Sequence, residues 1–98
     1  RFHTSVPVVL ETFTFLDRNA TRDVALAWKD SLETVPHLKV LPSTAKDLEQ
    51  AWTYCERPDF HKLSGVDAVS FVLMAQRHIR VAFAFDSHFS TAGFRMVG

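Results

Sequence analysis

The strongest structural signal in this chain lies at residues 65–85, which read GVDAVSFVLMAQRHIRVAFAF. The first part of this stretch, up to His78, has the apolar spacing of a helix. Its last five residues, VAFAF at 81–85, form an unbroken apolar run, which is typical of a strand buried on both faces of a parallel sheet. A helix followed by such a strand indicates a layered α/β architecture.

The flanking sequence extends this alternation of helices and strands. The expected helices cover residues 6–18, 21–35 and 44–56, and the expected strands cover residues 38–41 and 94–97. We predict a three-layer α/β/α fold with a mainly parallel sheet. The helix at 6–18 is apolar on most sides, which predicts burial. Because no strand is expected before it, we expect chain 1–98 to be a single domain that lacks its first strand and adjoining helices.

Composition excludes several classes of protein. The chain has 98 residues, of which 47% are hydrophobic and 22% charged, as in an ordinary globular domain. The single Cys55 excludes a disulfide framework and a cysteine-based zinc site, and it fits a reducing compartment. No apolar run approaches the ~20 residues of a membrane span. Eleven basic residues balance eleven acidic ones, so net charge does not point to a nucleic-acid binder.

Three of the eleven acidic residues differ from the rest. Glu11, Asp67 and Asp86 have no Lys or Arg within four positions, and each stands among apolar residues. Asp86 also follows the apolar run, at the end of a strand where open α/β sheets bind ligands. Three carboxylates meeting there would form an all-oxygen site for Mg²⁺ or Mn²⁺. The other eight read as solvated or locally paired carboxylates: Asp17, Asp23, Asp30, Glu33, Asp47, Glu49, Glu56 and Asp59.

Each of the three acids also has a structural interpretation. Asp67 could cap its helix, and Asp86 could form a turn before Ser87. Glu11 could pair with a distant Arg in the core. Their coincidence, rather than any single position, favours a metal site. His88 lies near Asp86 in sequence, and a surface imidazole is its simpler interpretation.

Two stretches resemble the PIN-domain family, and specifically its VapC-type toxin ribonucleases. VLETFTFLDR, at residues 9–18, resembles the family helix that carries the second acid, which falls on Glu11. LSGVDAVSFVLMAQRHIRVAFAFDSHFSTAGF, at residues 63–94, resembles the block with the third and fourth acids, which fall on Asp67 and Asp86. Within this block, Ser70 matches a family position often occupied by a small hydroxyl residue, and we give it a supporting role.

The resemblance implies a metal-dependent endoribonuclease that hydrolyses RNA phosphodiester bonds, with Mg²⁺ or Mn²⁺ held by Glu11, Asp67 and Asp86. VapC-like members act on tRNA, rRNA or mRNA, form homodimers and are silenced by a VapB-like antitoxin. We therefore expect a cytoplasmic toxin with no membrane association. The family's first acid lies on an N-terminal strand, and no Asp precedes Glu11, so the 98-residue piece alone is expected to be inactive. The candidate phosphate contacts are Arg57, Lys62, Arg77 and Arg80.

Two other interpretations remain open. The chain could be a catalytically degenerate PIN-like module that works only through protein contacts. It could also be an α/β domain in which all the acids are structural. Metal binding by the intact protein separates the nuclease from the first alternative, and the distances between the three carboxyl groups separate it from the second.

Overall fold

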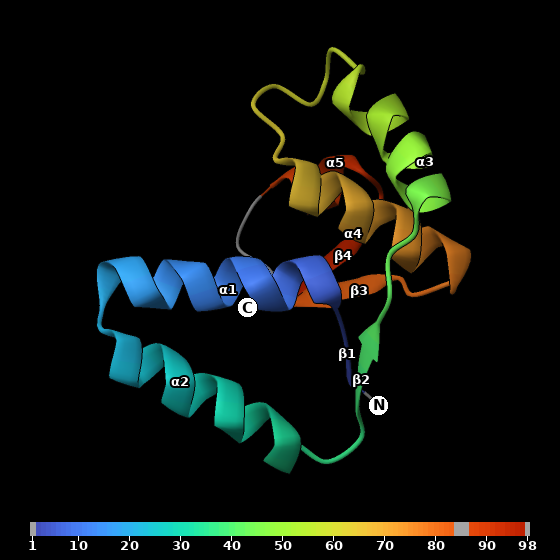
Figure 1. Ribbon diagram of the computed structural model, residues 1–98. Helices are drawn as coiled ribbons and strands as arrows, with labels where there is room; N and C mark the ends of the chain where they lie inside the picture. Colours follow the sequence, from blue (N-terminus) through green and yellow to red (C-terminus); the bar gives the residue numbers. More distant parts are fainter. Residues whose placement is uncertain (1, 84–86, 98) are drawn as a thin grey trace. The chain divides into compact units, whose positions relative to one another are not determined.

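The computed structural model describes residues 2–83 and 87–97 (Figure 1). The chain divides into two compact units, unit 1 at Arg1–Pro42 and unit 2 at Ser43–Gly98. Each unit contains one pair of parallel strands. The predicted α/β class with parallel strand pairing is therefore confirmed.

Unit 1 is a strand–helix–helix–strand arrangement. Its elements are β1 (Phe2–Ser5), α1 (Val6–Asn19), α2 (Arg22–Ser31), the 3₁₀ helix η1 (Leu32–Thr34) and β2 (Leu38–Leu41). Strands β1 and β2 run parallel, with Phe2 opposite Leu38 and Ser5 opposite Leu41. The Thr21 hydroxyl accepts a hydrogen bond from the Val24 amide at 3.1 Å, and this N-cap begins α2 where the sequence predicted.

Two expectations about unit 1 are wrong. A strand does precede the helix at 6–18, because β1 pairs with β2; its four residues are too short to give a recognisable alternation. That the chain is a single domain without its first strand and adjoining helices is a separate expectation, and it stays a prediction. Helix α1 is not buried either, since none of its residues is fully enclosed and Leu10 and Phe15 are 61% and 62% exposed. Helix α1 packs on α2 and on β1, and these neighbours cover only part of its surface.

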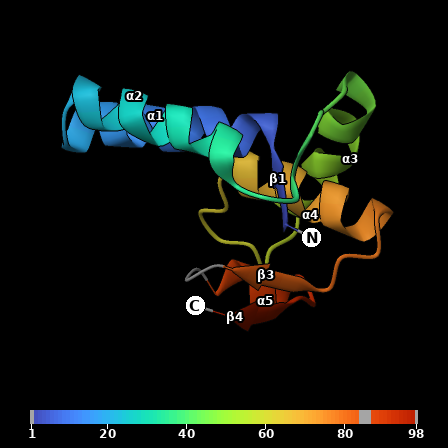
Figure 2. The same ribbon diagram turned by 90° about the horizontal axis from the view of Figure 1, so that it is seen from below.

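Unit 2 has a helical hairpin followed by a strand–helix–strand segment. Its elements are α3 (Ala45–Cys55), α4 (Gly65–Gln76), β3 (Val81–Phe83), α5 (His88–Thr91) and β4 (Arg95–Val97). Helices α3 and α4 pack on each other, and β3 and β4 lie side by side and parallel (Figure 2). The strand predicted at 81–85 is confirmed over Val81–Phe83, and its last two residues lie outside the described residues. The short helix α5 was not predicted.

The core of unit 2 centres on Phe71 of α4, which is 0% exposed. Its ring centroid lies 5.2 Å from that of Tyr54, 5.6 Å from Phe60, 4.8 Å from Phe89 and 5.8 Å from Phe94. The Tyr54 and Phe89 rings meet it edge-on, which is a favoured aromatic geometry. One side chain thus joins α4 to α3, to the loop after α3, to α5 and to the start of β4.

Asp47 is a buried carboxylate that the sequence placed among the solvated ones. It is 6% exposed, and its Oδ2 accepts the Thr44 amide at 2.9 Å while the Thr44 hydroxyl accepts the Asp47 amide at 3.2 Å. Its Oδ1 accepts a hydrogen bond from Gln76 Nε2 of α4 at 2.8 Å. The interpretation of Asp47 as a solvated or locally paired acid is therefore wrong. The neighbouring Lys46 suggested a local ion pair, whereas the Asp47 carboxylate forms a capping box with Thr44.

Truncation of Phe71 should destabilise unit 2 severely. We expect Phe71→Ala to lower the free energy of unfolding by about 3–5 kcal/mol, since a cavity would open where four rings meet. Urea denaturation followed by circular dichroism measures this loss. Leu48→Ala on α3 is the control, because Leu48 is 46% exposed and its removal should cost less than about 1 kcal/mol. Equal losses in the two variants would contradict this account of the core.

Asp47 should make stability depend on acid pH. The hydrogen bond from Gln76, followed by that from the Thr44 amide, holds the pKa of Asp47 below its usual value. A native pKa below the unfolded one stabilises the fold at neutral pH, and the contribution disappears as pH falls through the native pKa. We expect Asp47→Asn to lose about 1–3 kcal/mol at pH 7 in urea denaturation, and the gap from wild type to close as the pH falls through the native pKa of Asp47.

The control for this titration is Glu49→Gln, which neutralises an exposed carboxylate on the same helix. Its unfolding free energy should follow that of the wild type at neutral and at acid pH, within about 0.5 kcal/mol. A difference between Asp47→Asn and wild type that stays constant from neutral to acid pH would contradict a stabilising ionised Asp47.

Candidate functional site

Asp67 lies in the first turn of α4, at the head of the most buried helix of unit 2. The Ser64 hydroxyl accepts a hydrogen bond from the Asp67 backbone amide at 3.1 Å and so begins the helix. The side chain of Asp67 is half-buried. Because the positive end of the helix dipole faces the first turn, a carboxylate there is favoured in its ionised form.

The N-cap of α4 is Ser64 and not Asp67. The interpretation of Asp67 as the capping residue is therefore wrong, since Asp67 stands three positions inside the cap. The sequence signal for this arrangement was present, because Ser64 and Asp67 have the Ser-x-x-acid spacing typical of helix starts. The capping role passes to Ser64.

Ser70 lies one turn further along α4. Its hydroxyl donates a hydrogen bond to the Val66 carbonyl at 3.0 Å, and its side chain is half-buried. Residues three apart on a helix are neighbours on one face, so Ser70 and Asp67 share a side of α4. Since the Ser70 proton is directed to the backbone, its oxygen can act toward a third group as an acceptor.

The other two predicted acids are placed differently. Glu11 is an exposed residue of α1 in unit 1. Asp86 lies outside the described residues. The structure thus brings Asp67 and Ser70 together on one helix, and the meeting of Glu11, Asp67 and Asp86 stays a prediction.

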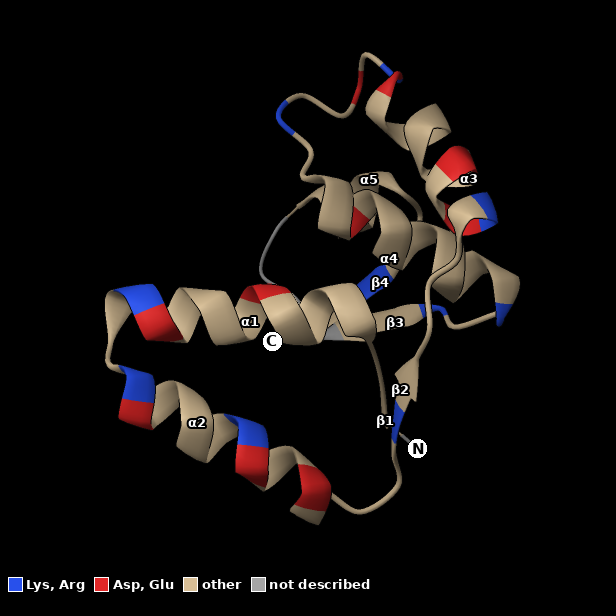
Figure 3. Cartoon of the chain, in the orientation of Figure 1, with Lys and Arg blue, Asp and Glu red and all other residues tan. Residues whose placement is uncertain are grey.

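Several of the remaining acids confirm the interpretation of local pairing. Arg22 Nε lies 2.5 Å from Asp17 Oδ1, and Lys29 Nζ lies 3.0 Å from Asp30 Oδ1. Acidic and basic residues stand next to each other along α2, as Figure 3 shows. These exposed pairs contribute little stability. Glu11 and Asp67 differ from these acids because neither has a Lys or Arg within four positions in the sequence.

His88 ties α5 to the loop that leads into α4. Its Nε2 lies 2.9 Å from the His61 carbonyl oxygen, and its ring lies 6.0 Å from that of Phe60. Because a carbonyl oxygen only accepts, Nε2 carries the hydrogen of this bond. His88 is half-buried, so the interpretation as a surface imidazole is wrong. The loop before Asp67 and the helix that follows residue 86 are thereby joined.

The donor set fits a hard divalent cation. Carboxylate oxygens such as those of the predicted ligands Asp67, Glu11 and Asp86 are what Mg²⁺ and Mn²⁺ prefer, and Asp67 lies in the first turn of a helix. Among residues 2–83 and 87–97, no group of three or more His, Cys, Asp or Glu residues is close enough to hold a metal ion. The participation of Asp86, which lies outside these residues, stays a prediction.

Comparison with known families and structures decides the classification. The PIN-domain family model matches residues 1–95. This chain belongs to the PIN-domain family. The 23S rRNA-specific endonuclease VapC20 of Mycobacterium tuberculosis, from strains CDC 1551 / Oshkosh and ATCC 25618 / H37Rv, is 42% identical to it over 92 residues. That match covers 93% of this chain and 69% of VapC20.

A solved structure supports the same conclusion. The crystal structure of M. tuberculosis VapC20, described as a sarcin–ricin loop cleaving toxin, matches this PIN domain with a TM-score of 0.83 at 39% identity. The match covers 94% of this chain and 70% of that one. The resemblance to VapC-type toxins is confirmed. In the described part of the PIN domain, no helix is long and apolar enough to cross a membrane.

Loss of the Ser64 cap should loosen the turn that carries Asp67. We expect Ser64→Ala to lower the free energy of unfolding by about 1 kcal/mol and to speed amide hydrogen exchange in the first turn of α4. Ser64→Asp is the matched control, since Asp also caps helices well and should retain the protection. If Ser64→Ala left exchange at Asp67 unchanged, the cap would not be what orders this turn.

Proposed function

We propose that this chain is a metal-dependent endoribonuclease, the toxin of a VapBC-like toxin–antitoxin system. The observation that carries the proposal is the position of Asp67, a half-buried carboxylate in the first turn of α4, inside the block that resembles the family's acidic positions. The PIN-domain match and the VapC20 relative support the same activity.

In this proposal Asp67, Asp86 and Glu11 would hold Mg²⁺ or Mn²⁺. The bound ion lowers the pKa of a water molecule and stabilises negative charge that develops on the phosphate. Asp67 would bind from the first turn of α4, where the helix dipole favours a negatively charged group. Ser70 supports the site, since its oxygen stands one turn from Asp67 and can accept a hydrogen bond from a water molecule or a ribose hydroxyl.

The partners follow from the same proposal. The substrate is RNA, and ribosomal RNA is favoured among tRNA, rRNA and mRNA by the VapC20 relative. We infer a VapB-like antitoxin that silences the nuclease, a homodimeric toxin and a cytoplasmic location. We also propose that the two compact units are parts of one PIN-like domain, which is supported by a family match running without interruption through residues 1–95.

Neutralising Asp67 should abolish most of the activity. We expect Asp67→Asn in the full-length gene product to cleave an RNA substrate about 100-fold more slowly or worse in Mg²⁺ or Mn²⁺, because one ligand of the catalytic ion loses its charge. The matched control is Asp23→Asn, since Asp23 stands in the first turn of α2 as Asp67 does in α4. Cleavage assays on labelled RNA compare the initial rates, and full activity in Asp67→Asn would remove the metal role.

Metal binding provides a second, independent measurement. Titration of the intact protein with Mn²⁺ in a calorimeter should show binding that Asp67→Asn weakens and Asp23→Asn leaves unchanged. Absence of Mn²⁺ binding by the wild type, together with absence of cleavage, would support the catalytically degenerate interaction module instead.

A further inference from the structure

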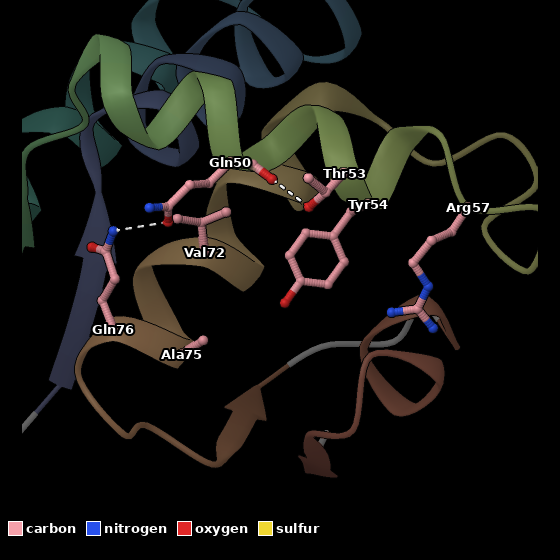
Figure 4. A pocket seen from close by; sticks show the side chains of 7 residues that line it. All are labelled: Gln50, Thr53, Tyr54, Arg57, Val72, Ala75 and Gln76. Carbon is pink, nitrogen blue, oxygen red and sulfur yellow. Dashed lines mark hydrogen bonds between the residues drawn. The ribbon is translucent and has the colours of Figure 1, made fainter.

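Unit 2 contains a cavity with a partly polar lining between α3 and α4. The cavity measures about 370 Å³, which is within the range of small-ligand sites. Its polar lining comes from a stripe of residues at helical spacing, Gln50, Thr53 and Tyr54 of α3 and Arg57 just past the end of that helix, and from Gln76 of α4 (Figure 4). Contacts between helices are normally apolar, so a facing stripe of amides, hydroxyls and a guanidinium needs its own explanation.

The orientation of the Gln50 amide is determined by a relay of hydrogen bonds. Gln76 Nε2 donates to the buried carboxylate of Asp47 at 2.8 Å, and a carboxylate can only accept, so that atom is the nitrogen. The same Nε2 donates to Gln50 Oε1 at 3.4 Å. The oxygen of Gln50 is thereby turned toward Gln76. Its NH₂ group, with two donor hydrogens, is left for a ligand.

Two of the remaining polar groups, those of Arg57 and Tyr54, can donate to a ligand, whereas the Thr53 hydroxyl already donates to the Gln50 carbonyl at 2.6 Å and offers an acceptor (Figure 4). Arg57 pairs with Asp59 through Nε at 3.0 Å and Nη2 at 2.5 Å, and this bidentate pair does not use Nη1. The guanidinium of Arg57 is stacked 4.6 Å from the centre of the Phe60 ring, which limits its rotation. The Tyr54 hydroxyl can donate as well as accept. A donor-rich cavity selects a ligand with several acceptor oxygens.

A guanidinium and a carboxylate lie on either side of Gln76 at the opposite end of the cavity. Arg77 follows the lining residue Gln76 and donates from Nη1 to Gln76 Oε1 at 3.4 Å. Its charge also contributes to the lowered pKa of Asp47, which places it within electrostatic reach of the cavity's end. The Asp47 carboxylate itself has both oxygens engaged by Thr44 and Gln76. The groups left to face a ligand therefore favour an anion.

The cavity is aligned with the helix that carries Asp67. Asp47 contacts Gln76 while Tyr54 contacts Phe71, so α3 and α4 run antiparallel and the Arg57 end of the stripe is the end nearer Asp67. Val72, which also lines the cavity, is five residues beyond Asp67 on α4, or about 7.5 Å along the helix axis. A phosphodiester chain with one phosphate in the cavity could extend to the first turn of α4.

We propose that the α3–α4 cavity binds a phosphate group of the RNA strand, with the Gln50 NH₂ and the Arg57 guanidinium as the donors. The proposal rests on the proposed function, because it assigns the anion to the RNA on which the nuclease acts. It adds a binding subsite outside the acidic residues, which would position the strand rather than take part in the chemistry.

Binding of RNA without a divalent ion tests the subsite. Fluorescence anisotropy with a labelled single-stranded RNA and intact protein in excess chelator should show that Gln50→Glu weakens affinity about tenfold. The new carboxylate still accepts the hydrogen bond from Gln76, so the fold is retained while the two donors facing the ligand become an anion. Gln50→Leu removes the donors without adding charge and should weaken affinity about threefold. Circular dichroism confirms that both variants are folded.

The control is Glu49→Gln, which changes one charge at the adjacent position of α3 and leaves the cavity lining untouched. Its RNA affinity should equal that of wild type within about twofold. Wild-type affinity in both Gln50 variants would overturn the subsite. A Gln50 side-chain amide resonance that shifts with inorganic phosphate but not with RNA would overturn RNA as the ligand. Because the assay contains no divalent ion, a failure of catalysis would overturn the proposed function and leave this result standing.

Discussion

The architecture of unit 2 depends on the aromatic contacts of Phe71. This ring touches Tyr54 on α3, Phe89 on α5 and Phe94 at the start of β4, and it is fully enclosed. Phe71 stands one helical turn after Asp67, and Phe89 is the second residue of α5. The same apolar contact therefore joins the helix that carries Asp67 to α5. Since a carboxylate cluster gains no stability from its own repulsive charges, such a site needs an apolar frame of this kind.

Polar interactions at the two ends of the α3–α4 hairpin complete this frame. At one end the buried Asp47 joins the start of α3 to Gln76 at the end of α4. At the other end Ser64 begins α4 and His88 bonds to the loop before it. A buried carboxylate is costly unless every oxygen is satisfied, and Asp47 meets that condition with partners from two helices. The cavity between α3 and α4 keeps its polar lining ordered because these bonds lie at its edge.

The sequence predicted the elements whose signals are local. The helices expected from residues 21 and 44 begin there, with Thr21 and Thr44 as their N-caps, and the apolar run beginning at Val81 is a strand paired in parallel with β4. It did not predict β1 or the role of Asp47. Strand β1 is defined by its pairing with β2, which lies more than thirty residues further along the chain. A four-residue segment is too short for its hydrophobic pattern to predict a strand. Asp47 was misjudged because its partner Gln76 lies on another helix, 29 positions further along the chain.

The comparison of Glu11 with Asp67 shows that apolar neighbours in the sequence do not by themselves predict that an acid is buried. Both acids stand among apolar residues, yet Glu11 is exposed on a helix without a fully buried residue. Asp67 heads a helix with five buried residues, Ala68, Val69, Phe71, Val72 and Leu73. A half-buried carboxylate on such a helix loses solvation, and the N-terminal dipole offsets only part of that cost. Of these two acids, Asp67 is the one that stands on a helix packed into a core, and the Phe71 contacts hold that helix in place.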